Sequence, residues 1–114
     1  MVKATSSPQS LFGRRLREAR LRAGIAQDKL GVMIGLDEGC SSARMSRYES
    51  GSHEPPLLIS QLLAKALRLP MAYFYAEDDT LAALLSLYGM LKVSEREALL
   101  NAAEMLAGAR DVER

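Results

Sequence analysis

The residues of this 114-residue chain that are best suited to molecular recognition lie between positions 42 and 53. On an α-helix, residues three and four positions apart share one face. A helix in this stretch would carry small and basic residues along one side: Ser42, Ala43, Ser46, Arg47 and Ser50, with Arg44 at the flank. Small side chains let a helix approach a groove wall, and arginine hydrogen-bonds base edges. The pattern favours binding in a DNA groove, although short amphipathic helices occur in helical domains of every kind.

No other set of residues has the spacing of an active site or a metal site. His53, the only histidine, lies beside Glu54 and two prolines without a nucleophile motif, so we expect it in a loop, contacting solvent or phosphate. Because Cys40 is the only cysteine, an internal disulfide is excluded. The paired acids at 37–38 and 77–79 lack the spacing of a metal site. The sequence therefore predicts a protein that is not an enzyme, with no cofactor, metal or evident small-molecule ligand.

Composition and charge predict a cytoplasmic protein with a basic first half. Apolar residues make up 48% of the chain and charged residues 25%, as in ordinary globular proteins. No apolar run is long enough to span a bilayer, and no signal-peptide pattern begins the chain. Residues 1–53 contain nine basic and five acidic side chains, a net charge of +4, whereas residues 54–114 contain six and nine, a net charge of −3. The basic half suits a polyanionic partner, and a solvated helix face explains it equally well.

The hydrophobic pattern predicts an all-α protein. Ser10 suits the N-cap of a first helix with an apolar face, and Gly24 suits its end. Gly35 ends a second helix, and the serine pair at 41–42 opens a third. The predicted helices cover residues 11–23, 27–34, 42–50, 57–67, 71–76, 81–88 and 94–107. The predicted organisation is a flexible arm, a helical bundle and a C-terminal helical segment, at residues 1–9, 10–76 and 77–114.

Five separated motifs together resemble the phage-repressor-like, or XRE-type, helix-turn-helix family over residues 11–76. The motifs are L-R-x-A-R-x-x-x-G from Leu16, A-Q-D-K-L from Ala26, M-S-R-Y-E-S-G from Met45, P-P from Pro55 and A-K-A-L-R-L-P-M-A-Y-F from Ala64. The resemblance implies a five-helix bundle, here followed by two C-terminal helices. It also implies that the third helix enters the major groove of double-stranded DNA and that the protein acts as a dimer.

The resemblance assigns roles to individual positions. The residues expected to contact bases are Ser42, Ala43, Arg44 and Arg47, of which Ser42, Ala43 and Arg47 match the family positions that usually face base edges. The positions matched to phosphate contacts are Gln27, Ser41, Ser50, Ser52 and His53, of which Ser41 is also the expected N-cap of the third helix. Arg20 and Glu49 match a partly buried ion pair that ties the first helix to the third. We expect this pair to stabilise the fold rather than to read DNA.

Two departures from the family pattern affect the site. Ala26 stands where the family often has a serine cap, which weakens the start of the second helix. Gly35 to Met45 spans ten positions, roughly four more than the family's usual turn, and such an insertion is thermodynamically cheap. We therefore expect an enlarged turn at residues 36–42, which changes the register in which residues of the third helix contact the bases. Asp37 and Glu38 in this turn should face away from DNA.

The C-terminal segment contains more apolar side chains than two short helices can cover. The leucines expected to form a dimer interface are Leu81, Leu84, Leu85, Leu99 and Leu106. Docking of the segment on its own bundle is the other interpretation. The sequence thus predicts a dimeric, sequence-specific transcriptional regulator, a repressor of bacterial or phage type that binds a two-fold-related operator. The alternative is a protein-interaction module, antitoxin-like or an adaptor, that uses the C-terminal helices.

Overall fold

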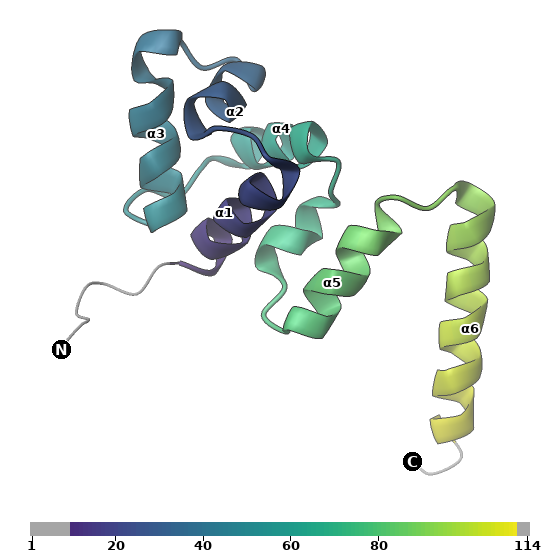
Figure 1. Cartoon of the computed structure of the whole chain (residues 1–114). Helices are drawn as coiled ribbons and strands as arrows, with labels where there is room; N and C mark the ends of the chain where they lie inside the picture. Colours follow the sequence, from purple (N-terminus) through teal and green to yellow (C-terminus); the bar gives the residue numbers. More distant parts are fainter. Residues whose placement is uncertain (1–9, 112–114) are drawn as a thin grey trace, which may run out of the picture.

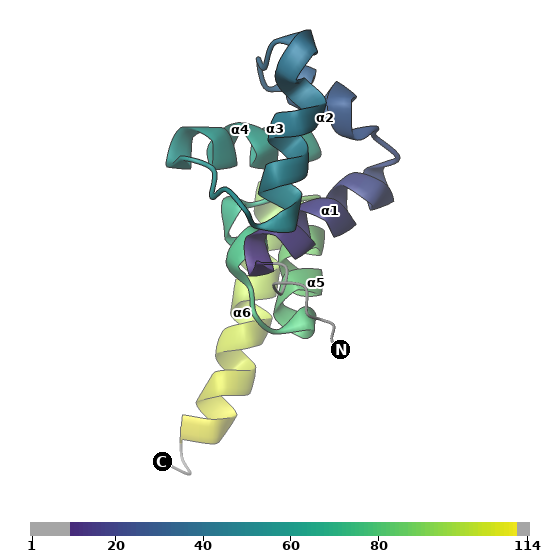
Figure 2. The same cartoon turned by 90° about the vertical axis from the view of Figure 1, so that its left-hand side faces the viewer.

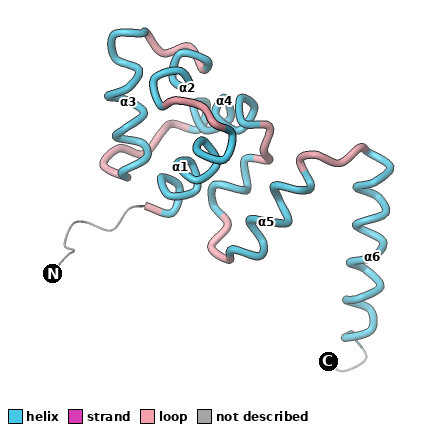
Figure 3. The backbone as a smooth tube through the Cα atoms, in the orientation of Figure 1, coloured by secondary structure: helices cyan, strands magenta, loops and turns pink. Residues whose placement is uncertain are grey.

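The computed structural model describes residues 10–111, and all regular structure in this range is helical, which confirms the all-α prediction (Figures 1 and 3). The predicted flexible arm at 1–9 lies outside the described residues. The elements, in chain order, are α1 (Leu11–Ala23), α2 (Gln27–Met33), α3 (Glu38–Ser50), α4 (Leu57–Leu67), the 3₁₀ helix η1 (Met71–Tyr75), α5 (Asp79–Tyr88) and α6 (Val93–Asp111). No helix in this part of the chain has the length and apolarity needed to cross a membrane.

The ends of α1 follow from its flanking residues. The Ser10 side chain accepts a hydrogen bond from the backbone N–H of Gly13 at 2.9 Å, which satisfies one of the free N–H groups of the first turn. Gly24 ends the helix with φ of 71°, a left-handed conformation that suits glycine. Between these caps, Phe12 and Leu16 face the core. The predicted bounds of this helix are confirmed.

One hydrophobic core lies between α1, α2, α3, α4 and η1. The Phe12 and Phe74 rings pack with centroids 4.7 Å apart, which joins α1 to η1. The largest side chains that are fully buried in this core come from all five elements: Leu16, Leu30, Met45, Leu63, Tyr73 and Phe74. Burial of this apolar surface is the main force that holds α2 and α3 in place.

A buried arginine fixes the start of α5 to the bundle. Arg15 of α1 is 3% exposed, and its Nε donates to the Ala76 carbonyl at 2.9 Å. Its Nη2 donates to Asp79 Oδ1 at 2.9 Å and to the Glu77 carbonyl at 3.3 Å. A buried charge is tolerated only when it is paired and hydrogen-bonded, and Arg15 meets both conditions. Leu85, predicted to form a dimer interface, instead packs partly against the core of its own bundle because α5 is held there.

The last helix, α6, stands away from the bundle (Figure 1). In the rotated view, α3 and α6 lie at opposite ends of the molecule (Figure 2). Of the side chains described at 93–109, only Arg96 and Leu99 are half-buried and the others are exposed. Arg96 donates to the Tyr88 carbonyl at 3.2 Å and lies 4.5 Å from the Tyr88 ring centroid, so it holds the start of α6 to the end of α5. Most of α6 therefore presents its apolar side chains to solvent.

Candidate nucleic-acid interface

The connection between α2 and α3 is short, so the enlarged turn predicted at residues 36–42 is wrong. The turn comprises residues 34–37, with Gly35 at φ of 96°. Asp37 has extended backbone, and α3 begins at Glu38. The additional residues lengthen α3 by one turn at its N-terminal end instead of enlarging the loop. They adopt a helical conformation because the added turn packs against α2.

Ser41 makes that packing contact, and the structure contradicts both roles predicted for it. Its side chain is 0% exposed, and its hydroxyl donates to the Asp28 carbonyl of α2 at 2.6 Å. Ser41 lies inside the helix and so is not its N-cap, and no surface remains for a phosphate contact. The close approach requires glycine opposite, because a Cβ at Gly31 would lie 1.9 Å from the Ser41 Oγ. The two residues lock the added turn of α3 onto α2.

The exposed face of α3 has the small and basic character that the spacing predicts. Its exposed side chains are those of Ser42, Ala43, Ser46, Arg47 and Ser50. The opposite side of the helix is buried through Met45, Tyr48 and Glu49. Gly39, in the added turn, is also exposed and lies three and four residues before Ser42 and Ala43. Along this face only Arg47 has a long side chain, so the helix backbone itself is accessible.

Arg44 lies at the flank of this face and is half-buried. Its Nη2 donates to the Tyr48 hydroxyl at 3.1 Å, and its guanidinium lies 6.0 Å from the Tyr48 ring centroid. The hydrogen bond to the Tyr48 side chain raises the pKa of Arg44 above its usual value. Arg44 is therefore a charged residue anchored to its own helix, whereas Arg47 projects from the face.

Gln27, the first residue of α2, is joined to α3 by its side-chain amide. Its Nε2 donates to Glu49 Oε1 at 3.2 Å, and its Oε1 accepts from the Ser42 hydroxyl at 3.3 Å. Gln27 also lines a shallow hollow of about 240 Å³ beside Ser46, with Arg17 of α1 on another side. Arg17 is exposed, and sequence reasoning did not single it out because the first helix contains five arginines. The hollow places an amide and a guanidinium at one edge of the α3 face.

The segment after α3 stays at the surface beside the same helix end. Gly51 ends α3 with φ of 85°, and the backbone N–H of His53 donates to the Arg47 carbonyl at 3.2 Å. The Ser50 hydroxyl lies 3.3 Å from the Ser52 hydroxyl and accepts from the Ser52 N–H. Ser50, Ser52 and His53 are all exposed. This arrangement leaves three polar side chains accessible at the C-terminal end of α3.

The ion pair expected between Arg20 and Glu49 is present in the structure and is buried. Arg20 Nε donates to Glu49 Oε2, and Arg20 Nη2 donates to Glu49 Oε1 at 3.1 Å, so the contact is bidentate. Arg20 Nη1 also donates to the Ile25 carbonyl, just before α2, at 2.9 Å. Together with Gln27, this network connects α1, α2 and α3. It fixes the orientation of α3 from the side opposite its exposed face.

Comparisons with known proteins agree with this geometry. The helix-turn-helix family model HTH_3 matches residues 16–74. A solved structure described as the transcriptional regulator BswR is 41% identical, covers 86% of this chain and 97% of its own, and superposes with a TM-score of 0.80. Comparison with the curated proteins gives no significant match. The α2–turn–α3 unit, the buried core behind it and the family match lead to one conclusion: the chain belongs to the XRE-type helix-turn-helix family of DNA-binding regulators.

Proposed function

We propose that this protein is a sequence-specific transcriptional regulator that inserts α3 into the major groove of DNA. The proposal rests on the difference between the two sides of α3. One side exposes small side chains and Arg47, and the opposite side is buried in the core. A helix of this kind fits the width of the major groove. The solved structure of similar sequence is described as a transcriptional regulator, which supports a regulatory role.

The exposed residues have distinct expected roles. Arg47 is placed to hydrogen-bond the O6 and N7 atoms of guanine, and Ser42 and Ala43 are small enough to contact base edges closely. Gln27 and the exposed residues after α3 are expected to contact phosphates, and we add Arg17 as a phosphate ligand from α1. Phosphate contacts from α1, α2 and the loop after α3 would fix the register in which α3 reads the bases.

The protein is proposed to act as a dimer through α5 and α6. In α6, the side chains of Leu100, Met105 and Leu106 are 58%, 77% and 72% exposed. Because most of the stability of a helix in a protein comes from packing of its apolar side, α6 requires a partner to cover that side. Leu81 and Leu84 of α5 are 44% and 45% exposed and add to the apolar surface that faces water. A second copy covers this surface by two-fold symmetry.

A symmetric dimer explains how the reading helices act together. Two copies of α3, placed about 34 Å apart, contact successive major grooves on one side of a duplex. An operator with two-fold related half-sites matches such a protein, and occupancy of a promoter by the dimer would block transcription. We therefore propose a cytoplasmic repressor of bacterial or phage type. The exposed surface of α6 also suits a protein-interaction module, which is the second candidate function.

Selection of preferred sites from a random pool of DNA duplexes tests the proposal. We expect enrichment of a two-fold symmetric sequence, followed by binding whose log affinity falls with log salt by about 0.9 per neutralised phosphate. A protein-interaction module would enrich no sequence at any salt concentration, and that result would refute the proposal. Because the symmetry of the selected site reports the arrangement of the two α3 helices, the same experiment tests the dimer.

A further inference from the structure

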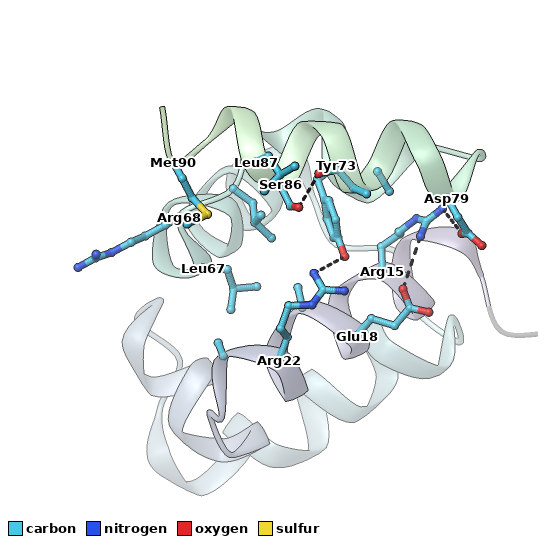
Figure 4. Close-up of a pocket in the computed structure, with 15 residues that line it drawn as sticks. Arg15, Glu18, Arg22, Leu67, Arg68, Tyr73, Asp79, Ser86, Leu87 and Met90 are labelled. Atoms are coloured by element: carbon cyan, nitrogen blue, oxygen red, sulfur yellow. Dashed lines mark hydrogen bonds and ion pairs between the residues drawn. The ribbon is translucent and has the colours of Figure 1, made fainter. Parts of the chain in front are cut away.

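A groove of about 620 Å³ lies between α1, the end of α4 and α5 (Figure 4). Its volume is within the range of small-molecule sites in proteins. No residue of α3 lines it, so the groove is separate from the DNA-reading face. Leu81 and Leu84, on the proposed dimer surface, do not line it either. The groove is therefore separate from both the exposed face of α3 and the proposed dimer surface. It lies where the helical bundle that contains α3 joins the C-terminal segment.

The groove contains a buried tyrosine whose hydroxyl retains hydrogen-bonding capacity. Tyr73 is 1% exposed, and its hydroxyl oxygen accepts a hydrogen bond from Arg22 Nη1 at 3.4 Å (Figure 4). Within residues 10–111, no group accepts a hydrogen bond from this hydroxyl. A phenol O–H and a guanidinium side by side can both donate to one carboxylate. The pair thus has the donors for an anionic head group.

The charges around the groove also favour an anion. Arg15 is already paired, with Asp79 at 2.9 Å and with Glu18 at 3.5 Å, so this end of the groove is neutralised (Figure 4). Arg22 and Arg68 also line the groove, and neither takes part in an ion pair formed by the described residues. The groove therefore keeps an excess of positive charge.

The other end of the groove carries apolar side chains beside Arg68. Leu67 of α4, Leu87 of α5 and Met90 line it together (Figure 4). Leu87 is 57% exposed and Met90 is 78% exposed, so both present apolar surface to water. Covering such surface with hydrocarbon is favourable. A ligand that fits the groove thus needs an anionic head and an apolar body.

We propose that this groove binds a small amphipathic carboxylate. The carboxylate accepts hydrogen bonds from the Arg22 guanidinium and the Tyr73 hydroxyl, and the apolar body lies along Leu87 and Met90. The bound molecule contacts both α1 and α5. It therefore connects the bundle that carries α3 to the segment that carries the proposed dimer surface, which makes the groove suited to an effector.

Calorimetric titration of the full chain with octanoate, octan-1-ol and octylammonium tests this proposal. We expect octanoate to bind at least about tenfold more tightly than octan-1-ol, because hydrogen bonds to a charged group contribute that much to the affinity. Octylammonium, which has the opposite charge, should not bind. Tyr73→Phe removes only the hydroxyl and should weaken octanoate binding about tenfold. The matched control is Tyr75→Phe, because Tyr75 belongs to the same helix but does not line the groove.

Arg22→Gln provides an independent variant at an exposed position, where folding is not at risk. It should weaken octanoate binding, whereas Arg17→Gln, on the same helix but outside the groove, should not. Equal binding of octanoate and octan-1-ol, absence of octanoate binding, or unchanged binding by Arg22→Gln would each overturn the proposal. DNA binding is measured without octanoate, so failure of the groove proposal is distinguishable from failure of the proposed regulatory function.

Discussion

Gly31 of α2 lies directly against Ser41 of α3, with no room for a side chain between them. A Cβ atom at Gly31 would stand 1.9 Å from the Ser41 Oγ and 3.0 Å from Met45 Cγ. The Ser41 hydroxyl cannot move away without losing its 2.6 Å hydrogen bond to the Asp28 carbonyl. This contact determines how closely the two helices of the DNA-binding unit approach each other.

Gly31→Ala should therefore destabilise the protein by about 1–3 kcal/mol, the usual cost of overpacking a well-packed site. Urea denaturation followed by circular dichroism measures the change. Gly39→Ala is the matched control, because Gly39 is an exposed helical position whose added Cβ meets nothing closer than 3.5 Å. That variant should change stability by less than about 0.5 kcal/mol, as substitutions at exposed positions usually do. Equal effects of the two substitutions would contradict the tight contact.

Removal of one partner from the Arg20–Glu49 pair should strongly destabilise the protein. Arg20→Met takes two hydrogen bonds from a buried carboxylate, and we expect a loss of about 3–5 kcal/mol in the free energy of unfolding. Arg14→Met is the control, since the Arg14–Glu18 pair is about 40% exposed at both side chains and should change stability by less than about 1 kcal/mol. A double variant, Arg20→Met with Glu49→Met, should recover much of the loss because no charge remains buried there.

Arg47→Ala tests direct reading of a base. If Arg47 hydrogen-bonds a guanine, binding to the selected site should weaken by about 1–3 kcal/mol while binding to random duplex changes little. Fluorescence anisotropy with both duplexes at one salt concentration measures the difference. Arg22→Ala removes the same charge from α1, at a position that lines the groove beside α5, and should not alter the preference between the duplexes. An equal loss on both duplexes would identify Arg47 as a phosphate contact.

Substitution of the exposed leucines tests the dimer. Leu84→Glu with Leu106→Glu places two charges on the proposed interface and should convert the protein into a monomer of 12.5 kDa, measured by light scattering. Binding to a two-fold symmetric site should then fall steeply, because the half-sites are no longer bound by linked partners. Leu58→Glu is a suitable control because Leu58 of α4 is 64% exposed and lies outside this surface. A dimeric double variant would exclude α5 and α6 as the interface.

The contact between Arg15 and Asp79 predicts a specific acid dependence. The hydrogen bond from Arg15, with the charge of that arginine, lowers the pKa of Asp79 below its usual value. A carboxyl group whose pKa is lowered by folding stabilises the protein at pH values above its pKa in the unfolded chain, which is about 4. This stabilisation is lost as the pH falls through the lowered pKa of the folded state. Asp79→Asn should therefore make stability fall less steeply below pH about 4 in denaturation measurements. An unchanged slope would indicate that Asp79 titrates alike in both states.

Local sequence patterns predicted the helices well where local contacts define them. Ser10 and Gly24 limit α1 through interactions within a few residues of the helix ends, so their types alone were informative. The start of α3 was predicted wrongly for the opposite reason. Serine is favoured at caps because its side chain bonds to nearby backbone, which made 41–42 resemble a helix start. The Ser41 hydroxyl instead bonds to Asp28, thirteen residues away, and no local pattern indicates that partner.

The difference between local and long-range contacts also decides how much of the α3 face and of the groove could be predicted. The exposed face of α3 could be predicted because helical periodicity alone separates Arg47 from Met45. The groove beside α5 could not, because it depends on Arg15 reaching Asp79, sixty-four positions away. The Arg20–Glu49 pair spans 29 positions and was expected only from resemblance to a family. Long-range contacts of this kind follow from the assembled fold rather than from any single segment.

One side of α3 is buried and the other is exposed, and this difference has a consequence for evolution. Positions such as Ala43 and Ser46 are exposed and contribute no buried apolar surface, whereas Met45 and Tyr48 hold the helix. If α3 reads DNA as proposed, mutations at the exposed positions should change the preferred DNA sequence at little cost in stability. A lineage carrying this fold could then acquire new target genes through one or two surface substitutions, without first having to rebuild its interior.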